Sequence, residues 1–111
     1  MKIEVDPKLA ENAGWANTLA QANRFIESLP GPATMEAAGA WHPGDGADRA
    51  ELELRFTDPP LTMRRTFRRA DLQDTDEFKR QMYTYWGDFL SVLSRKLGAL
   101  VRESVASLGN E

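Results

Sequence analysis

The side chain best suited to acid–base chemistry is His42, the single histidine of the sequence. An imidazole acts as a general base when it lies within hydrogen-bond reach of a partner, and Asp45 or Asp48 could orient it. That arrangement would predict an active site or a small-ligand pocket near His42. We favour a polar loop residue instead, because no serine, threonine or second histidine shares a recognisable motif with it.

The segment 45–48, Asp-Gly-Ala-Asp, carries carboxylates of the kind that bind cations. It lacks the alternating acidic positions and the terminal glutamate of a calcium loop, so we interpret it as a turn. The sequence therefore predicts no catalytic, cofactor-binding or metal-binding residues.

Arginines are concentrated between positions 49 and 69. Arg64 and Arg68 would share the outer face of a β-hairpin, where they could bind an anion or a nucleic acid. Glu51 and Glu53 would lie on the same face and could form cross-strand ion pairs with them. We favour this ladder of ion pairs over a nucleic-acid surface, because the chain has a net charge of −3 and no aromatic side chain lies between the outward arginines. A nucleic-acid-binding protein stays open as an alternative.

The dominant feature of the chain is a proline-free stretch from Thr75 to Leu108, which predicts one amphipathic helix. Its apolar residues form two stripes that together cover about half of the helix circumference. The first stripe comprises Phe78, Met82, Tyr85, Phe89 and Val92. The second comprises Trp86, Leu90, Leu93, Leu97, Leu100 or Val101, and Leu108. Such a wide apolar surface must be covered from two directions.

This helix is longer than the domain that carries it. At 1.5 Å per residue it spans about 51 Å, whereas a compact chain of this size is about 35 Å across. One end should therefore project and expose apolar side chains, which self-association would cover. A break at Gly87 or Gly98 is the alternative, because each glycine costs about 1 kcal/mol relative to alanine in a helix interior.

We therefore predict a non-catalytic protein that works by association, as a homodimer that presents a surface to an unidentified protein partner. An adaptor, a chaperone or an immunity-like binder would act in this way. Aromatic residues at helical spacing are more often core or interface residues than parts of a ligand pocket. The predicted contact residues are Trp86, Leu90, Leu93, Leu97, Leu100, Val101 and Leu108.

Local signals predict the remaining elements. Asp6 and Pro7 indicate the start of a helix that ends at Leu29, before a Pro-Gly-Pro sequence. Ile3 and Val5 permit a short extra strand in front of it. Asp74 and Glu77 have the spacing of a capping box for the long helix.

Alternating patterns predict strands over 33–41, 49–57 and 61–68, with a loop at 42–48 and a turn at 58–60. The fold class is α+β, in which a helix, a three-stranded antiparallel sheet and a long C-terminal helix follow one another and the helices pack on one sheet face.

The composition fits a single domain over residues 1–111. An apolar fraction of 41% and a charged fraction of 28% are typical of globular proteins. The absence of cysteine excludes disulfides and thiolate metal sites. The first residues lack the apolar segment of a secretory signal, and no run of 18 apolar residues could span a membrane, so we expect a cytoplasmic protein.

Overall fold

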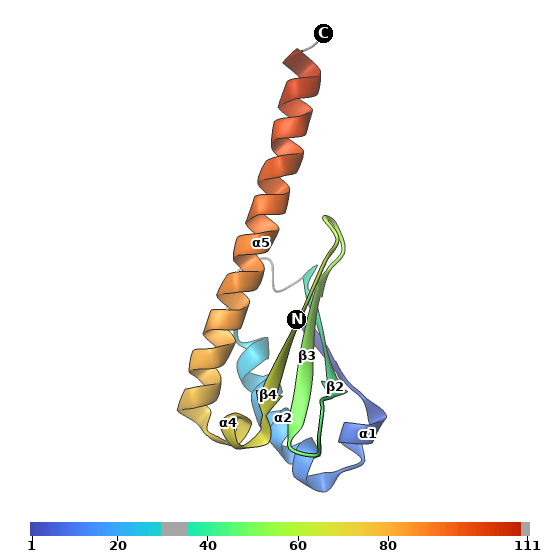
Figure 1. Cartoon of the computed structure of the whole chain (residues 1–111), viewed down its shortest axis with the longest axis vertical. Coiled ribbons are helices and arrows are strands. Elements are labelled where there is room, and N and C mark those ends of the chain that lie inside the picture. Colours follow the sequence, from blue (N-terminus) through green and yellow to red (C-terminus); the bar gives the residue numbers. More distant parts are fainter. Residues whose placement is uncertain (30–35, 110–111) are drawn as a thin grey trace.

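The computed structural model describes residues 1–29 and 36–109, with side chains up to Arg102. Its elements are β1 (Lys2–Val5), α1 (Pro7–Ala10), α2 (Ala13–Glu27), β2 (Ala38–Pro43), β3 (Arg49–Phe56), β4 (Leu61–Arg68), α4 (Arg69–Gln73) and α5 (Thr75–Gly109). The four strands form one sheet in the order β1-β2-β3-β4, in which β1 and β2 are parallel and the other neighbours are antiparallel (Figure 1). The predicted α+β class is confirmed, and the possible extra strand is present as the edge strand β1.

The predicted helix from Pro7 to Leu29 is two helices, so this prediction was wrong in its extent. The Asp6 side chain caps α1 by accepting a hydrogen bond from the backbone N–H of Lys8 at 2.9 Å. The chain then becomes extended at Asn12, whose side-chain oxygen accepts from the N–H groups of Gly14 and Trp15 at 3.0 and 3.3 Å. Asparagine is among the strongest N-cap residues, and here it starts a second helix.

Apolar residues at helical spacing follow from Trp15 to Leu29, and the structure buries them. Five of these side chains are at most 5% exposed and belong to the core: Trp15, Leu19, Ala22, Ile26 and Leu29. Because these side chains lie in the core, the apolar side of α2 faces the sheet.

Strand β2 lies further along the chain than predicted. The predicted strand covers 33–41, of which 33–35 lie outside the described residues. Strand β2 begins at Ala38 and continues through His42 and Pro43, for which the sequence predicts a loop. His42 pairs with Glu51 and Pro43 with Ala50. Proline is tolerated there because β1 pairs only as far as Trp41, so the end of β2 has a strand neighbour on one side only.

One face of the sheet, covered by α2 and α5, forms the core (Figure 1). Phe67 of β4 is 1% exposed, and its ring centroid lies 5.7 Å from those of Trp41 and Phe78 and 6.3 Å from that of Tyr85. The Tyr85 hydroxyl donates a hydrogen bond to the backbone carbonyl of Leu52 at 2.9 Å, which ties α5 to the central strand β3. Helices on one sheet face were predicted, and the alternation of β3 and β4 produces this arrangement.

Helix α5 is continuous from Thr75 to Gly109, without a break at Gly87 or Gly98. It extends well beyond the sheet (Figure 1), and the longest dimension of the molecule is 61 Å against 26 and 22 Å across. The prediction of a single long, projecting helix is confirmed. The short helix α4 in front of it was not predicted; its Leu72 is 4% exposed and anchors it in the core.

Candidate functional site on the projecting part of helix α5

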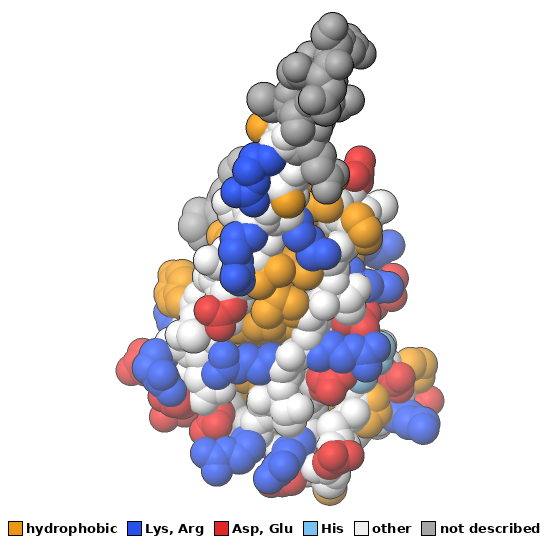
Figure 2. All heavy atoms as spheres, turned by 45° about the horizontal axis from the view of Figure 1, so that its top comes forward, with side chains coloured by type: hydrophobic (Ala, Val, Ile, Leu, Met, Phe, Trp, Pro, Cys, Tyr) orange, Lys and Arg blue, Asp and Glu red, His pale blue; other side chains and the backbone are white. Residues whose placement is uncertain are grey.

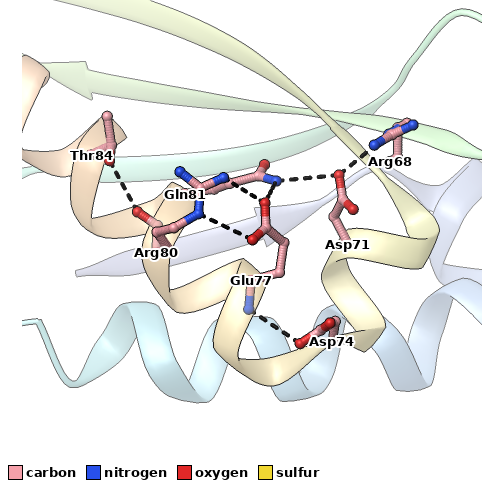
Figure 3. Close-up of polar contacts among 7 residues, drawn as sticks. All are labelled: Arg68, Asp71, Asp74, Glu77, Arg80, Gln81 and Thr84. Atoms are coloured by element: carbon pink, nitrogen blue, oxygen red, sulfur yellow. Dashed lines mark hydrogen bonds and ion pairs between the residues drawn. The ribbon is translucent and has the colours of Figure 1, made fainter.

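The first turn of α5 is fixed by polar contacts at its N-terminus (Figure 3). The Asp74 side chain accepts a hydrogen bond from the backbone N–H of Glu77 at 3.2 Å, as the capping-box spacing predicted. The Glu77 carboxylate accepts from Arg80 and, at 2.8 Å, from Gln81. These hydrogen bonds, the one from Arg80 first, lower the pKa of Glu77 from 4.5 to about 2. The Gln81 side chain also donates a hydrogen bond to Asp71 at 3.2 Å, which links the second turn of α5 to the preceding helix α4.

The body covers the first stripe of α5 and also the beginning of the second. Trp86 and Leu93, which the sequence placed in the dimer contact, are each 4% exposed and belong to the core of one chain. Helix α2 reaches this side of α5, because the ring of Phe25 lies edge-on against Phe78 and Tyr83 at 5.8 and 5.2 Å between centroids. Trp86 and Leu93 are therefore not part of the candidate surface.

The stripe becomes exposed where α5 leaves the body. Leu97 and Leu100 are each 45% exposed and Val101 is 61% exposed; we call these three residues the distal apolar patch. Leu90, also a predicted contact, is partly buried at the border of the core. Figure 2 shows hydrophobic side chains at the surface close to the grey end of the molecule, with Lys and Arg side chains beside them. The side chain of Leu108 lies outside the described residues.

A groove adjoins the distal apolar patch on the side of the β3–β4 turn. Its volume is about 300 Å³, and it is lined by Asp58, Pro59, Pro60, Lys96, Ala99 and Leu100. The sequence identified the Asp-Pro-Pro turn but gave no signal that it would lie beside the helix, since the two segments meet only in the folded chain. The groove widens the apolar surface that a partner could cover.

The two candidate anion-binding arginines are engaged by carboxylates. Arg64 lies 2.9 Å from Glu53 and 3.3 Å from Glu51, as the strand register predicts. Arg68 lies 3.3 Å from Asp71 at the start of α4, a partner that the sequence analysis did not foresee (Figure 3). A nucleic-acid surface would need an uncompensated basic patch, and these two guanidinium groups do not form one.

His42 lies on the outer face of the sheet rather than in a loop. Its Nε2 is 3.9 Å from a carboxylate oxygen of Glu53, whereas Asp45 and Asp48 were the partners considered from the sequence. This nitrogen is buried and has no hydrogen-bond partner within the described part of the chain. A cavity of about 180 Å³ beside the β2–β3 turn is lined by Pro43, Gly44, Asp45, Arg49, Glu51 and Thr66, and His42 is not part of its wall. Among the described residues, the carboxylate beside His42 is that of Glu53 and not that of Asp45 or Asp48, so the general-base arrangement considered as an alternative is not formed there.

Among residues 1–29 and 36–109, no group of three or more His, Cys, Asp or Glu side chains is placed so that it could hold a metal ion. None of the helices described is both long enough and apolar enough to cross a membrane. Comparisons with protein-family models, with curated proteins and with solved structures each found no match.

Proposed function

We propose that this protein is non-catalytic and works by self-association, with two copies joined through the distal apolar patch of α5. The observation that carries the proposal is that α5 continues beyond the sheet and there exposes Leu97, Leu100 and Val101 by about half of their surfaces. Exposed apolar side chains in a contiguous group mark interaction surfaces more often than scattered ones do.

The spacing of these residues favours another helix as the occupant. Leu90, Leu93, Leu97 and Leu100 follow one another at intervals of three, four and three residues, which is the heptad pattern of helices that pack side by side. A second copy of α5 supplies the same pattern. Because α2 already covers the start of the stripe through Phe25, the free part begins at about Leu97.

The β4 edge of the sheet is less suited to self-association than the helix. Strand β4 is one of the two outer strands of the sheet and carries Arg64, Arg65 and Arg68. Antiparallel pairing of two β4 strands would bring these charges close together, and charged side chains are a common protection of edge strands. We therefore assign the contact to α5.

The expected contact is modest in energy. Complete burial of a leucine side chain contributes about 1.5–3 kcal/mol, so covering the exposed 45% of Leu97 contributes about 1 kcal/mol per copy. As an adaptor, a chaperone or an immunity-like binder would, the dimer would present the bodies of its two copies to an unidentified protein partner. We place the protein in the cytoplasm, because it has no cysteine that would point to an oxidising compartment.

Substitution of Leu97 tests the proposal. Leu97→Asp removes about 1 kcal/mol of burial per copy and adds a buried carboxylate whose desolvation costs at least about 1 kcal/mol more. Over two copies this weakens association by about 4 kcal/mol, or about a thousandfold in the dissociation constant. We expect light scattering to give the mass of one chain for Leu97→Asp at concentrations where the unmodified protein has twice that mass.

Ser91→Asp is the matched control, because it introduces the same charge on the exposed, solvated side of the same helix. It should leave the mass unchanged, and far-ultraviolet circular dichroism should show the same helix content for both variants. Equal masses for the unmodified protein and Leu97→Asp at all concentrations would contradict the proposal.

A further inference from the structure

A recess between α2 and α4 lies apart from the surface proposed for self-association. Its volume is about 370 Å³, within the range of small-molecule sites. The wall contains amide and hydroxyl side chains and one guanidinium group, but no carboxylate. The lining residues are Gly14, Asn17, Thr18, Gln21, Arg69 and Gln73.

Arg69 is positioned through both its side chain and its backbone. It lies over the ring of Trp15, 5.6 Å from the centroid. Gly14 leaves the space that it occupies, because a Cβ atom at that position would overlap a terminal nitrogen of Arg69. The backbone N–H of Arg69 donates a hydrogen bond to the carbonyl of Asp48 at 2.7 Å. The side chain is therefore preorganised, which lowers the entropy cost of binding a ligand.

Within the described ranges no carboxylate lies within 4.0 Å of the Arg69 guanidinium group, whereas Arg55, Arg64, Arg68 and Arg80 each have at least one. An arginine that is fixed against an aromatic ring and faces uncharged hydrogen-bonding groups is arranged to receive an anion.

We propose that this recess binds a small molecule through an oxyanion group, either a carboxylate or a phosphate. Arg69 would hold two of its oxygens in a bidentate contact, and the amide groups of Asn17, Gln21 and Gln73 would donate to the remaining acceptors. The Thr18 hydroxyl takes a structural role, because it already donates to the carbonyl of Gly14 at 2.8 Å. Gly14 lies in the first turn of α2, where the helix dipole adds a favourable positive potential.

The test is a titration with inorganic phosphate, and in parallel with acetate, at constant ionic strength and followed by amide NMR. We expect saturable shifts at Gly14, Gln21, Gln73 and the indole N–H of Trp15. Saturation by phosphate alone would identify the phosphate group as the ligand, and saturation by both would identify an oxyanion site without further selectivity. Shifts that stay linear in concentration with both probes would overturn the proposal.

Variants separate a built site from general charge effects. Arg69→Gln should weaken phosphate binding by roughly ten- to a hundredfold, as expected when a charge-assisted hydrogen bond is lost. Arg95→Gln removes the same charge from the exposed side of α5 and should change nothing. Gly14→Ala keeps the charge but displaces the guanidinium, and it should weaken binding about as strongly as Arg69→Gln. Equal affinities for Arg69→Gln and Arg95→Gln would also overturn the proposal, and the amide spectra report whether each variant is folded.

Discussion

Replacing Gly87 by alanine should stabilise the protein, because Gly87 lies in the middle of a helix and faces open space. It is exposed, and a Cβ atom added to it would meet nothing within 4 Å. Its neighbours Trp86 and Phe89 are core residues, so this turn of α5 unfolds together with the body. The gain in helix propensity should therefore appear in the global free energy of unfolding.

The expected gain is about 1 kcal/mol, the difference in helix propensity between glycine and alanine. In a domain of about 100 residues, 1 kcal/mol raises Tm by about 4–8 °C. Thermal unfolding followed by circular dichroism at 222 nm measures this shift directly. Unfolding in urea provides an independent value of the free energy.

Gly46→Ala is the matched control with the opposite sign. Gly46 has a φ of +92°, in the left-handed region that a residue with a Cβ adopts only at a cost, so this variant should be destabilised by about 1 kcal/mol. A Tm for Gly87→Ala equal to or below that of the unmodified protein would refute the reasoning, because it would mean that α5 bends or breaks at this position.

Two further predictions concern single contacts of α5. Tyr85→Phe removes the buried hydroxyl that donates to Leu52, and we expect the free energy of unfolding in urea to fall by about 1–2 kcal/mol; an unchanged value would show that this hydrogen bond contributes nothing net. The folded-state pKa of Glu77 is lowered to about 2, so its contribution to stability is complete above pH 4.5 and is lost as the pH falls from 4.5 through 2. An NMR titration of its carboxyl carbon should give a midpoint near 2 that rises in Arg80→Gln, and a midpoint near 4.5 in the unmodified protein would contradict the assigned hydrogen bonds.

The elements that the sequence predicted well are those with a long, uninterrupted pattern. Helix α5 was identifiable because its apolar residues repeat at helical spacing without a proline and Asp74 provides a cap. Strands β3 and β4 were identifiable because apolar and polar residues alternate in each, with Arg65 as the exception in β4, and the Asp-Pro-Pro sequence between them forces a turn. For such elements the local sequence is sufficient for a prediction.

The boundaries that were wrong depend on competition between local signals. Helix α1 ends at Ala10 and Asn12 starts another helix, although apolar residues on both sides of the break, Leu9 and Trp15, belong to the same core. In β2, the proline and glycine signals after Trp41 suggested a loop, but pairing with β3 carries the strand through Pro43. The side-chain hydrogen bonds of Asn12 decide the first boundary, and the pairing of His42 and Pro43 with β3 decides the second.

Helical periodicity could not show which apolar residues of α5 the body would cover. Trp86 and Leu93 lie on the same stripe as Leu97, yet they are buried because α2 and the sheet reach that far along the helix. The Arg69 recess was hidden for a similar reason, since Gly14 and Arg69 are distant in sequence and meet only in the fold. Neither sequence segment carries a motif that would have identified the recess.

Sedimentation equilibrium of the unmodified protein over a wide concentration range is the most direct test of self-association through α5. We expect the mass to rise from that of one chain towards twice that value and then to stay constant, as for a closed dimer. A mass that remains that of a single chain at the highest concentrations would contradict it, because the side chains exposed beyond the sheet would then have no second copy to cover them.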